Sequence, residues 1–368
     1  MKYWRGYVVA AIFAAITAAL VAFAKAHSTL VDMVYPYMTR IVISTLADWS
    51  SGVSFCVWNV LVCLGIALLL TTVILIIVLR WNPFQMAGWV LAVLLFFNMC
   101  TTVLYGLNEY TGPLTEDVRL ETTEYIATDL NEAAVYFRDQ ANLLAAEISR
   151  DSDGAAVFSD FEEMAKQAAD GFNTLTYTDA ISIFAGSTAP VKAVKLSGEL
   201  SKTLPLTGEA LVDPRTADAA LPFVMCMEMA RRMSIADHEE AMYAAFLACK
   251  ENSSLEYRYS GYLMAYTLCY EALVTNPTST AQSCASTPKL GNSPLLNRDL
   301  RTLDKVLSKL TRDEMHEYDV VDLLTSWYIQ EFVTPLHQVE EKPFDPLDPT
   351  QVDLKYTEPT PTKLEKKK

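Results

Sequence analysis

The sequence has little histidine and no paired-cysteine motif. Its 368 residues include four histidines, which lie far apart, and seven cysteines without a C-x-x-C spacing. Cysteine metal sites normally need such closely spaced pairs, so a site of that kind is excluded and buried thiols are expected. If the later part of the chain is extracytoplasmic, Cys269 and Cys284 are the first pair in which to expect a disulfide.

Basic residues are also scarce, with 29 Lys and Arg against 44 Asp and Glu and a formal net charge of −15. Most of the acidic excess follows Tyr105. A strongly acidic surface repels phosphate groups, so nucleic acid is excluded as a partner. There is no glycine-rich phosphate-binding loop and no internal repeat, which excludes a P-loop nucleotide site and a repeat architecture.

What the sequence does have is apolar residues, at 51% of the chain. Three runs, at about 7–24, 57–79 and 87–105, are long enough to be transmembrane helices. The first could instead be a signal peptide, but its apolar run exceeds the usual length and favours an uncleaved anchor. We expect the connection 25–55 to contain a short interfacial or amphipathic piece.

The basic residues near the apolar runs predict an orientation. Lys2, Arg5 and Arg80 fall on one side of the membrane, which the cytoplasmic bias of Lys and Arg makes the inner side. The amino terminus is then cytoplasmic and everything after Tyr105 is extracytoplasmic. The lipid bilayer is accordingly the first partner that the sequence predicts.

After the membrane region 1–105, residues 106–342 are predicted to form one domain. Helical periodicity indicates a long amphipathic helix from Thr115 to Ile148, and the alternation in 191–213 indicates an extended or hairpin segment. The fold class is therefore mainly α with a small β segment. The Pro-, Thr- and Lys-rich stretch 343–368 is predicted to be a disordered tail.

The run from Leu221 to Cys249 reads as two consecutive helices that carry acidic residues on faces that could meet. Met227, Glu228 and Arg231 occupy the positions of an H-E-x-x-H motif, in which two ligands share a helix face with a general base. Glu240, on the second helix, stands where a third, carboxylate ligand would complete a zinc site. Both carboxylates are present and both histidines are missing.

With its flanks, this run resembles an uncharacterised family of bacterial membrane-anchored proteins that carry a domain of unknown function and are regarded as zinc metallopeptidases. The shared order is L-T-G-E at 206–209, L-P-F at 221–223, E-A at 240–241, L-A-C at 247–249 and R-Y-S-G-Y at 258–262. The resemblance implies a mostly helical zincin-like domain at the bacterial cytoplasmic membrane. Its general-base position is Glu228, and its metal-ligand positions are Met227, Arg231 and Glu240.

The resemblance also implies a substrate cleft. A strand near the metal helix lines the cleft in zincin-like folds, so Thr207, Gly208 and Glu209 are candidates for its edge, although an ordinary turn is the alternative. We expect the tyrosine-rich helix that follows to line the cleft as well. Its candidates are Arg258, Tyr259 and Tyr262.

The departures from the family pattern fall where the chemistry would be. A thioether is a poor partner for hydrolytic zinc and a guanidinium repels a divalent cation, so we expect no metal cofactor. The expected function is a catalytically inactive metallopeptidase-like module that binds an envelope peptide or another membrane protein. The alternative is an active zinc peptidase with a rearranged site that uses His238, Cys226 or His316. A transporter is disfavoured, because the apolar runs hold no internal ionisable residue.

Loss of the metal would leave two buried acids to repel each other. Arg231 lies one turn from Met227, and we predict that its guanidinium bridges Glu228 and Glu240 by charge-assisted hydrogen bonds. An organic cation would then replace the inorganic one. The alternative is that Arg231 points into solvent.

Overall fold

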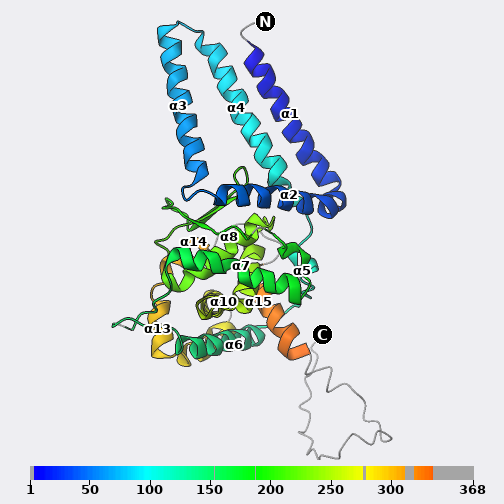
Figure 1. The fold of residues 1–368 in the computed structure, drawn as a ribbon. Helices are drawn as coiled ribbons and strands as arrows, with labels where there is room; N and C mark the ends of the chain where they lie inside the picture. The colour runs from blue at the N-terminus through cyan, green and yellow to red at the C-terminus, as the bar shows by residue number, and fades with distance from the viewer. Residues whose placement is uncertain (1–3, 153, 187, 277–278, 311–318, 335–368) are drawn as a thin grey trace, which may run out of the picture.

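The computed structural model describes residues 4–334 except 153, 187, 277–278 and 311–318. Three apolar helices, α1 (Arg5–Ala26), α3 (Val57–Val78) and α4 (Pro83–Leu104), stand on one side of a helical domain. Helix α2 (Ser28–Ser51) lies across their base, between them and the domain (Figure 1). The mainly helical fold class is confirmed, whereas the predicted tail 343–368 lies outside the described residues.

Each of the three apolar helices has 22 residues and is long and apolar enough to cross a membrane, as predicted. The third begins at Pro83, earlier than the sequence suggested. The Asn82 side chain accepts a hydrogen bond from the backbone N–H of Phe84 at 3.0 Å, and a proline in the first turn costs no helical hydrogen bond. The cap therefore sets this boundary.

Helices α1 and α4 pack closely, and α3 stands apart. A Cβ atom on Gly6 would lie 2.5 Å from the carbonyl carbon of Gly88, so the two backbones can approach only because neither residue has a side chain. Helix α3, in contrast, has no buried residue. It would present its whole apolar length to lipid.

Helix α2 is amphipathic and occupies most of the predicted connection 25–55. Its inner face packs on the domain, where the Thr39 and Ser234 hydroxyls are hydrogen-bonded at 3.1 Å and Ile43 is fully buried. Its other face exposes large apolar side chains: Leu30, Met33, Val34, Tyr37, Met38, Ile41, Val42 and Trp49. The helix itself lies at the level where the apolar helices end (Figure 1).

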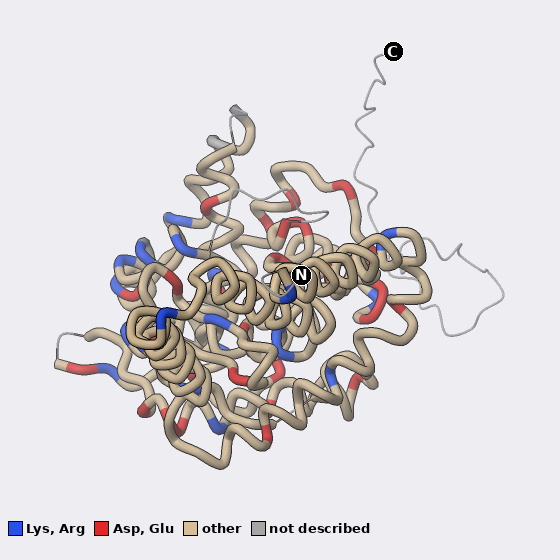
Figure 2. Tube along the Cα trace, turned by 90° about the horizontal axis from the view of Figure 1, so that it is seen from above, with Lys and Arg blue, Asp and Glu red and all other residues tan. Residues whose placement is uncertain are grey.

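The domain is a layered set of helices around one core. Helix α10 packs between α6 and α9, and nearly every residue of α8 and α9 is buried. Viewed from above, acidic and basic residues are interspersed over this domain (Figure 2). Its helices are η2 (Gly106–Tyr110), α5 (Leu114–Asp117), α6 (Ala127–Ala145), α7 (Phe161–Thr178), η3 (Ser182–Phe184), η4 (Asp218–Ala220), α8 (Leu221–Arg232), α9 (His238–Glu251), α10 (Leu255–Thr275), α11 (Ser279–Cys284), α12 (Ser286–Leu290), α13 (Pro294–Leu300), α14 (Asp304–Leu310), α15 (Val320–Tyr328) and η5 (Ile329–Val333).

Two expectations need correction. The helix predicted to run unbroken from Thr115 to Ile148 is instead interrupted at residues 118–126, because a non-helical stretch separates α5 from α6. In that stretch the Thr123 N–H donates to the Ser326 hydroxyl at 3.2 Å, so the backbone is paired with a distant helix and not with its own turn. All seven cysteines are free thiols, so the structure contains no Cys269–Cys284 disulfide.

The predicted extended segment 191–213 forms a small sheet. Its strands are β1 (Lys192–Ala193), β2 (Ser201–Leu204) and β3 (Glu209–Val212), in the order β1-β3-β2. Strand β3 is parallel to β1 and antiparallel to β2. It contacts α8 on one side and α2 on the other, so the sheet joins the domain to the layer of apolar helices.

The start of β3 attaches the domain to α2 and α3. A Cβ atom on Gly208, which has a φ of +67°, would lie 2.3 Å from the backbone nitrogen of Ala47 in α2. The buried Glu209 carboxylate accepts hydrogen bonds from the N–H groups of Val57 and Trp58, at the start of α3, at 2.7 and 2.9 Å. Lys192 pairs with the same carboxylate at 2.8 Å. A charged cap on a helix N-terminus thus holds the two layers together.

This attachment predicts a pH-dependent stability. Burial alone would raise the pKa of Glu209, but the hydrogen bonds from Lys192 and the α3 backbone outweigh it and lower the pKa below its ordinary value of 4.5. The contribution is therefore complete above about pH 4.5 and is lost as the pH falls through the lowered value. We expect Glu209→Gln to lower the unfolding free energy at pH 7 by about 3 kcal/mol, since it strands the partly buried Lys192.

The measurement is denaturant unfolding of the full chain in detergent from pH 7 to pH 3. The difference from wild type should shrink below pH 4.5, and a difference that grows there would contradict the assignment. Glu199→Gln is the matched control, because its pair with Lys202, at 3.7 Å, is half exposed and contributes less than about 1 kcal/mol.

Candidate functional site

The carboxylate of Glu228 lies at the centre of the candidate site and has no solvent exposure. Residues two apart on a strand face the same side, and Ser201 and Thr203 of β2 both point at α8. The Ser201 hydroxyl donates to Glu228 Oε1 at 2.9 Å, and the Thr203 hydroxyl donates to Oε2. Both carboxylate oxygens of Glu228, which the resemblance gives as the general-base position, are therefore bonded to hydroxyl groups of the sheet.

Arg231 supplies the opposite charge. Its Nη1 lies 3.6 Å from Glu228 Oε1, and 20% of its side chain is exposed. Burial would lower the pKa of Arg231, but Glu228 and the hydroxyl of Tyr105 outweigh that effect and the pKa is raised. The guanidinium thus stays charged between α8 and the end of α4.

The second carboxylate of the predicted site has another partner. Glu240 Oε1 accepts a hydrogen bond from the backbone N–H of Leu114, the first residue of α5, at 2.8 Å. Arg231 thus forms an ion pair with Glu228 at a distance longer than the predicted hydrogen bond, while the described bond of Glu240 leads to α5. His238, two residues earlier, donates from Nε2 to the carbonyl oxygen of Leu310 at 2.8 Å and points elsewhere.

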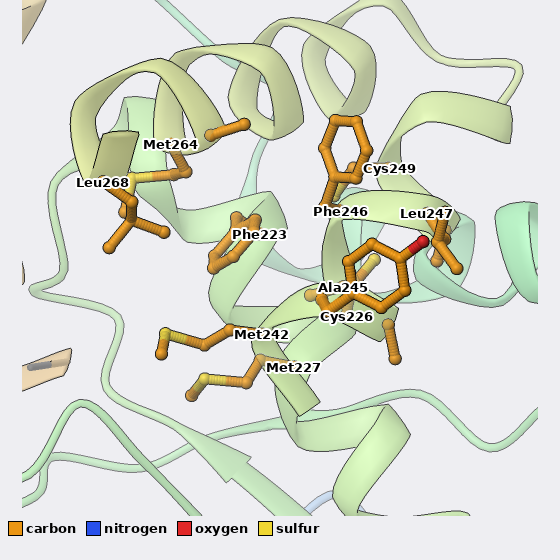
Figure 3. Packing of buried hydrophobic residues seen from close by; sticks show 14 of the residues in the cluster. Phe223, Cys226, Met227, Met242, Ala245, Phe246, Leu247, Cys249, Met264 and Leu268 are labelled. Carbon is orange, nitrogen blue, oxygen red and sulfur yellow. The ribbon is translucent and has the colours of Figure 1, made fainter. Parts of the chain in front are cut away.

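Met227, at one of the two histidine positions of the resemblance, has a second methionine, Met242 of α9, as its neighbour. Both are buried, and they lie side by side with their thioethers extended in the same direction (Figure 3). The two methionines therefore form one apolar contact between α8 and α9. Methionine suits this role because its flexible side chain fills irregular space.

Beside these residues is a cavity of about 270 Å³. Met227 and Arg231 line it from α8, His238 from α9, and Ser308 to Leu310 from the end of α14. The chain from Gly198 into β2 forms the remaining wall. Strand β2 lies at an edge of the sheet. This wall of the cavity therefore includes the first residue of an edge strand.

The candidate cleft residues fall in two places. Thr207, Gly208 and Glu209 lie at the contact with α2 and α3 described above, and the Thr207 hydroxyl donates to Glu209 at 2.9 Å. Arg258, Tyr259 and Tyr262 lie in the first part of α10. Tyr259 is buried and donates to Asp299, and the Tyr262 ring packs edge-on against Phe246 with 5.9 Å between centroids. The structure does not bring the two groups together.

The side chains present do not fit a zinc ion. The two histidine positions hold a thioether and a charged guanidinium, and the general-base position is bonded to two hydroxyls. Among residues 4–334 without the gaps stated above, no three His, Cys, Asp or Glu side chains converge as a metal-binding group. His316, one candidate for a rearranged site, lies outside the described residues.

Sequence reasoning missed three neighbours of this site: Ser201, Thr203 and Tyr105. The first two could have been found, because Ser-Lys-Thr in a predicted strand places two hydroxyls on one face. Tyr105 was predicted only as the end of an apolar run. Its contact with Arg231 joins residues that are far apart in the chain and have no pattern in common.

The fold defines a class: a chain with three helices fit to span a membrane and one mainly helical domain. The pattern of a protein family described as "protein of unknown function (DUF3810)" matches residues 31–323, well over half of the chain. The chain belongs to this family. The match begins in α2 and ends in α15, so the family unit includes α3, α4 and the domain together. Neither the curated proteins nor the solved structures contain a match.

The pairing of Arg231 with Glu228 generates a prediction. Arg231→Ala should lower the unfolding free energy by about 3 kcal/mol, because it leaves a fully buried carboxylate without its cation. Adding Glu228→Gln should recover part of the loss, since the amide carries no charge. Denaturant unfolding of the full chain tests both variants.

Lys202→Ala is the control, because Lys202 is half exposed. An Arg231→Ala curve that coincides with this control would show that Arg231 contributes nothing to stability. The alternative in which its side chain simply points into solvent would then be correct.

Proposed function

We propose that this protein is a membrane-anchored, catalytically inactive metallopeptidase-like module that binds a peptide or a segment of another membrane protein at the bacterial cell envelope. The observation that carries the proposal is the state of Glu228. A general base needs a free lone pair directed at a water molecule, whereas this carboxylate is buried between two hydroxyls and a guanidinium. The former site is built for stability and not for proton transfer.

The binding role is supported by the cavity and the strand beside it. Edge strands offer unpaired backbone groups to an extended peptide, and β2 is such a strand. Arg231 and Lys309 line the cavity that adjoins its start, so a carboxylate on the peptide would find cationic partners there. The site would thus bind an extended acidic segment without any chemical step.

The anchoring geometry supports an extracytoplasmic domain. Arg5 begins α1 and Arg80 follows α3, and both lie at the end of the apolar helices that is farthest from the domain (Figure 1). Basic residues that flank membrane helices are enriched on the cytoplasmic side. The domain would accordingly face outward, where envelope peptides are present.

Metal content tests the loss of catalysis. The full chain, purified in detergent and exposed to zinc, should bind no stoichiometric metal. The resemblance predicts that the Met227→His, Arg231→His double variant gains about one equivalent, since two imidazoles and a carboxylate make a zinc site. One equivalent in wild type would overturn the inactive reading in favour of a rearranged zinc peptidase. A double variant without zinc would count against the metallopeptidase ancestry alone.

Reporter fusions test the orientation. Alkaline phosphatase, which needs an oxidising compartment to fold, should be active when fused after Lys368 and inactive when inserted at Trp81 between α3 and α4. The reverse pattern would place the domain in the cytoplasm. Green fluorescent protein at the same two positions provides the complementary control.

A further inference from the structure

A second cavity, of about 320 Å³, opens between α2, α5 and η3, away from the site around Glu228. Its wall on α2 consists of two neighbouring rows of side chains, each with the i, i+4 spacing that aligns residues along a helix. The inner row is Asp32, Pro36 and Arg40. The outer row is Met33, Tyr37 and Ile41. One side of the cavity therefore changes from charged to apolar within the width of a helix.

The outer row belongs to the exposed apolar face of α2. Met33, Tyr37 and Ile41 are 69%, 64% and 47% exposed, which is high for large apolar side chains in a row. Helix α2, which carries them, lies at the level where α1, α3 and α4 end (Figure 1). If those helices span a bilayer, this row lies at its surface, and the cavity opens among lipid headgroups.

The inner row meets two acids across the cavity. Arg40 donates from Nη1 to the carbonyl oxygen of Ser182 at 2.8 Å, while its Nε is buried without a hydrogen-bond partner. Asp32 accepts from the N–H of Gly112 at 2.7 Å, and Glu116 and Asp117 are exposed on α5. Three carboxylates thus face one guanidinium. The cavity carries a net negative charge, with one cationic group at its inner side.

The charged groups around this cavity shift the pKa of Asp117. Although the Asp117 side chain is accessible from the cavity, the surrounding protein takes away part of its hydration. This desolvation, and then the nearby Asp32 carboxylate, raise the pKa of Asp117, and Arg40 only partly offsets them. A positive group from outside would relieve this repulsion. Within the described part of the chain no three acidic side chains converge closely enough to hold a metal ion, so an extended organic cation fits the spacing better.

We propose that this cavity binds the headgroup of an aminophospholipid, phosphatidylethanolamine being the simplest example. The ammonium group, with three N–H donors, lies between Asp32 and Asp117, and the phosphate accepts from Arg40. The acyl chains pass over Met33, Tyr37 and Ile41 into the bilayer. The volume is at the lower end of the range of small-ligand sites, which suits a headgroup and excludes a folded partner.

The test is native mass spectrometry of the full chain in detergent, titrated with phosphatidylethanolamine, phosphatidylglycerol and phosphatidylcholine of the same acyl chains. Phosphatidylethanolamine should bind roughly five- to tenfold more tightly than the other two, because choline has no N–H donor and glycerol has no charge. Asp117→Asn should remove this preference. Arg40→Gln should weaken the binding of all three lipids.

Glu109→Gln is the matched control, because Glu109 is an exposed acid of η2 next to α2 but outside the cavity. It should leave the preference unchanged. Equal affinities of wild type for the three lipids, or an unchanged preference in Asp117→Asn, would overturn the proposal. Free phosphoethanolamine that bound as tightly as the lipid would also overturn it, since the ligand would then be a soluble one.

Discussion

The buried carboxylate of Glu228 is the constraint on which the centre of this molecule depends. An unpaired charge at zero exposure would cost several kcal/mol, so each neighbouring element has to provide a partner. Strand β2 provides two hydroxyls and α8 provides Arg231. Arg231 in turn contacts Tyr105 at the end of α4. The charge at the core therefore determines how the sheet, the central helix and an apolar helix fit together.

Glu209 repeats this arrangement on the other side of the sheet. Its carboxylate is also buried, with one cation and several hydrogen-bond donors as partners. Two of these donors are backbone N–H groups at the start of α3. The two carboxylates attach the sheet to two different apolar helices, α4 through Arg231 and α3 directly. A ligand that bound in the cavity beside Arg231 would therefore contact a domain that two charged interactions attach to the apolar helices.

The sequence predicted the elements whose pattern is local. Uniform apolar runs identified α1, α3 and α4, and helical spacing identified α8 and α9 with their acids. It failed where distant partners decide the structure, as at Thr123, whose backbone is bonded to Ser326 some two hundred residues later. The resemblance directed attention to Glu228, and the structure buries this residue completely. It could not show that Thr207, Gly208 and Glu209 attach the domain to α2 and α3, since that contact depends on Ala47 and Val57.

Met227 and Arg231, at the two positions that the resemblance assigns to histidine ligands, fill space and balance charge without a metal ion. A histidine left without metal would be a buried polar group with an unpaired nitrogen, which is costly. Met227 avoids this by packing on Met242, and Arg231 avoids it by taking over the positive charge that Glu228 requires. A smaller residue at position 227 would leave a void, and a neutral one at position 231 would leave an unbalanced carboxylate. Together the two side chains support the packing of α8 on α9 and β2.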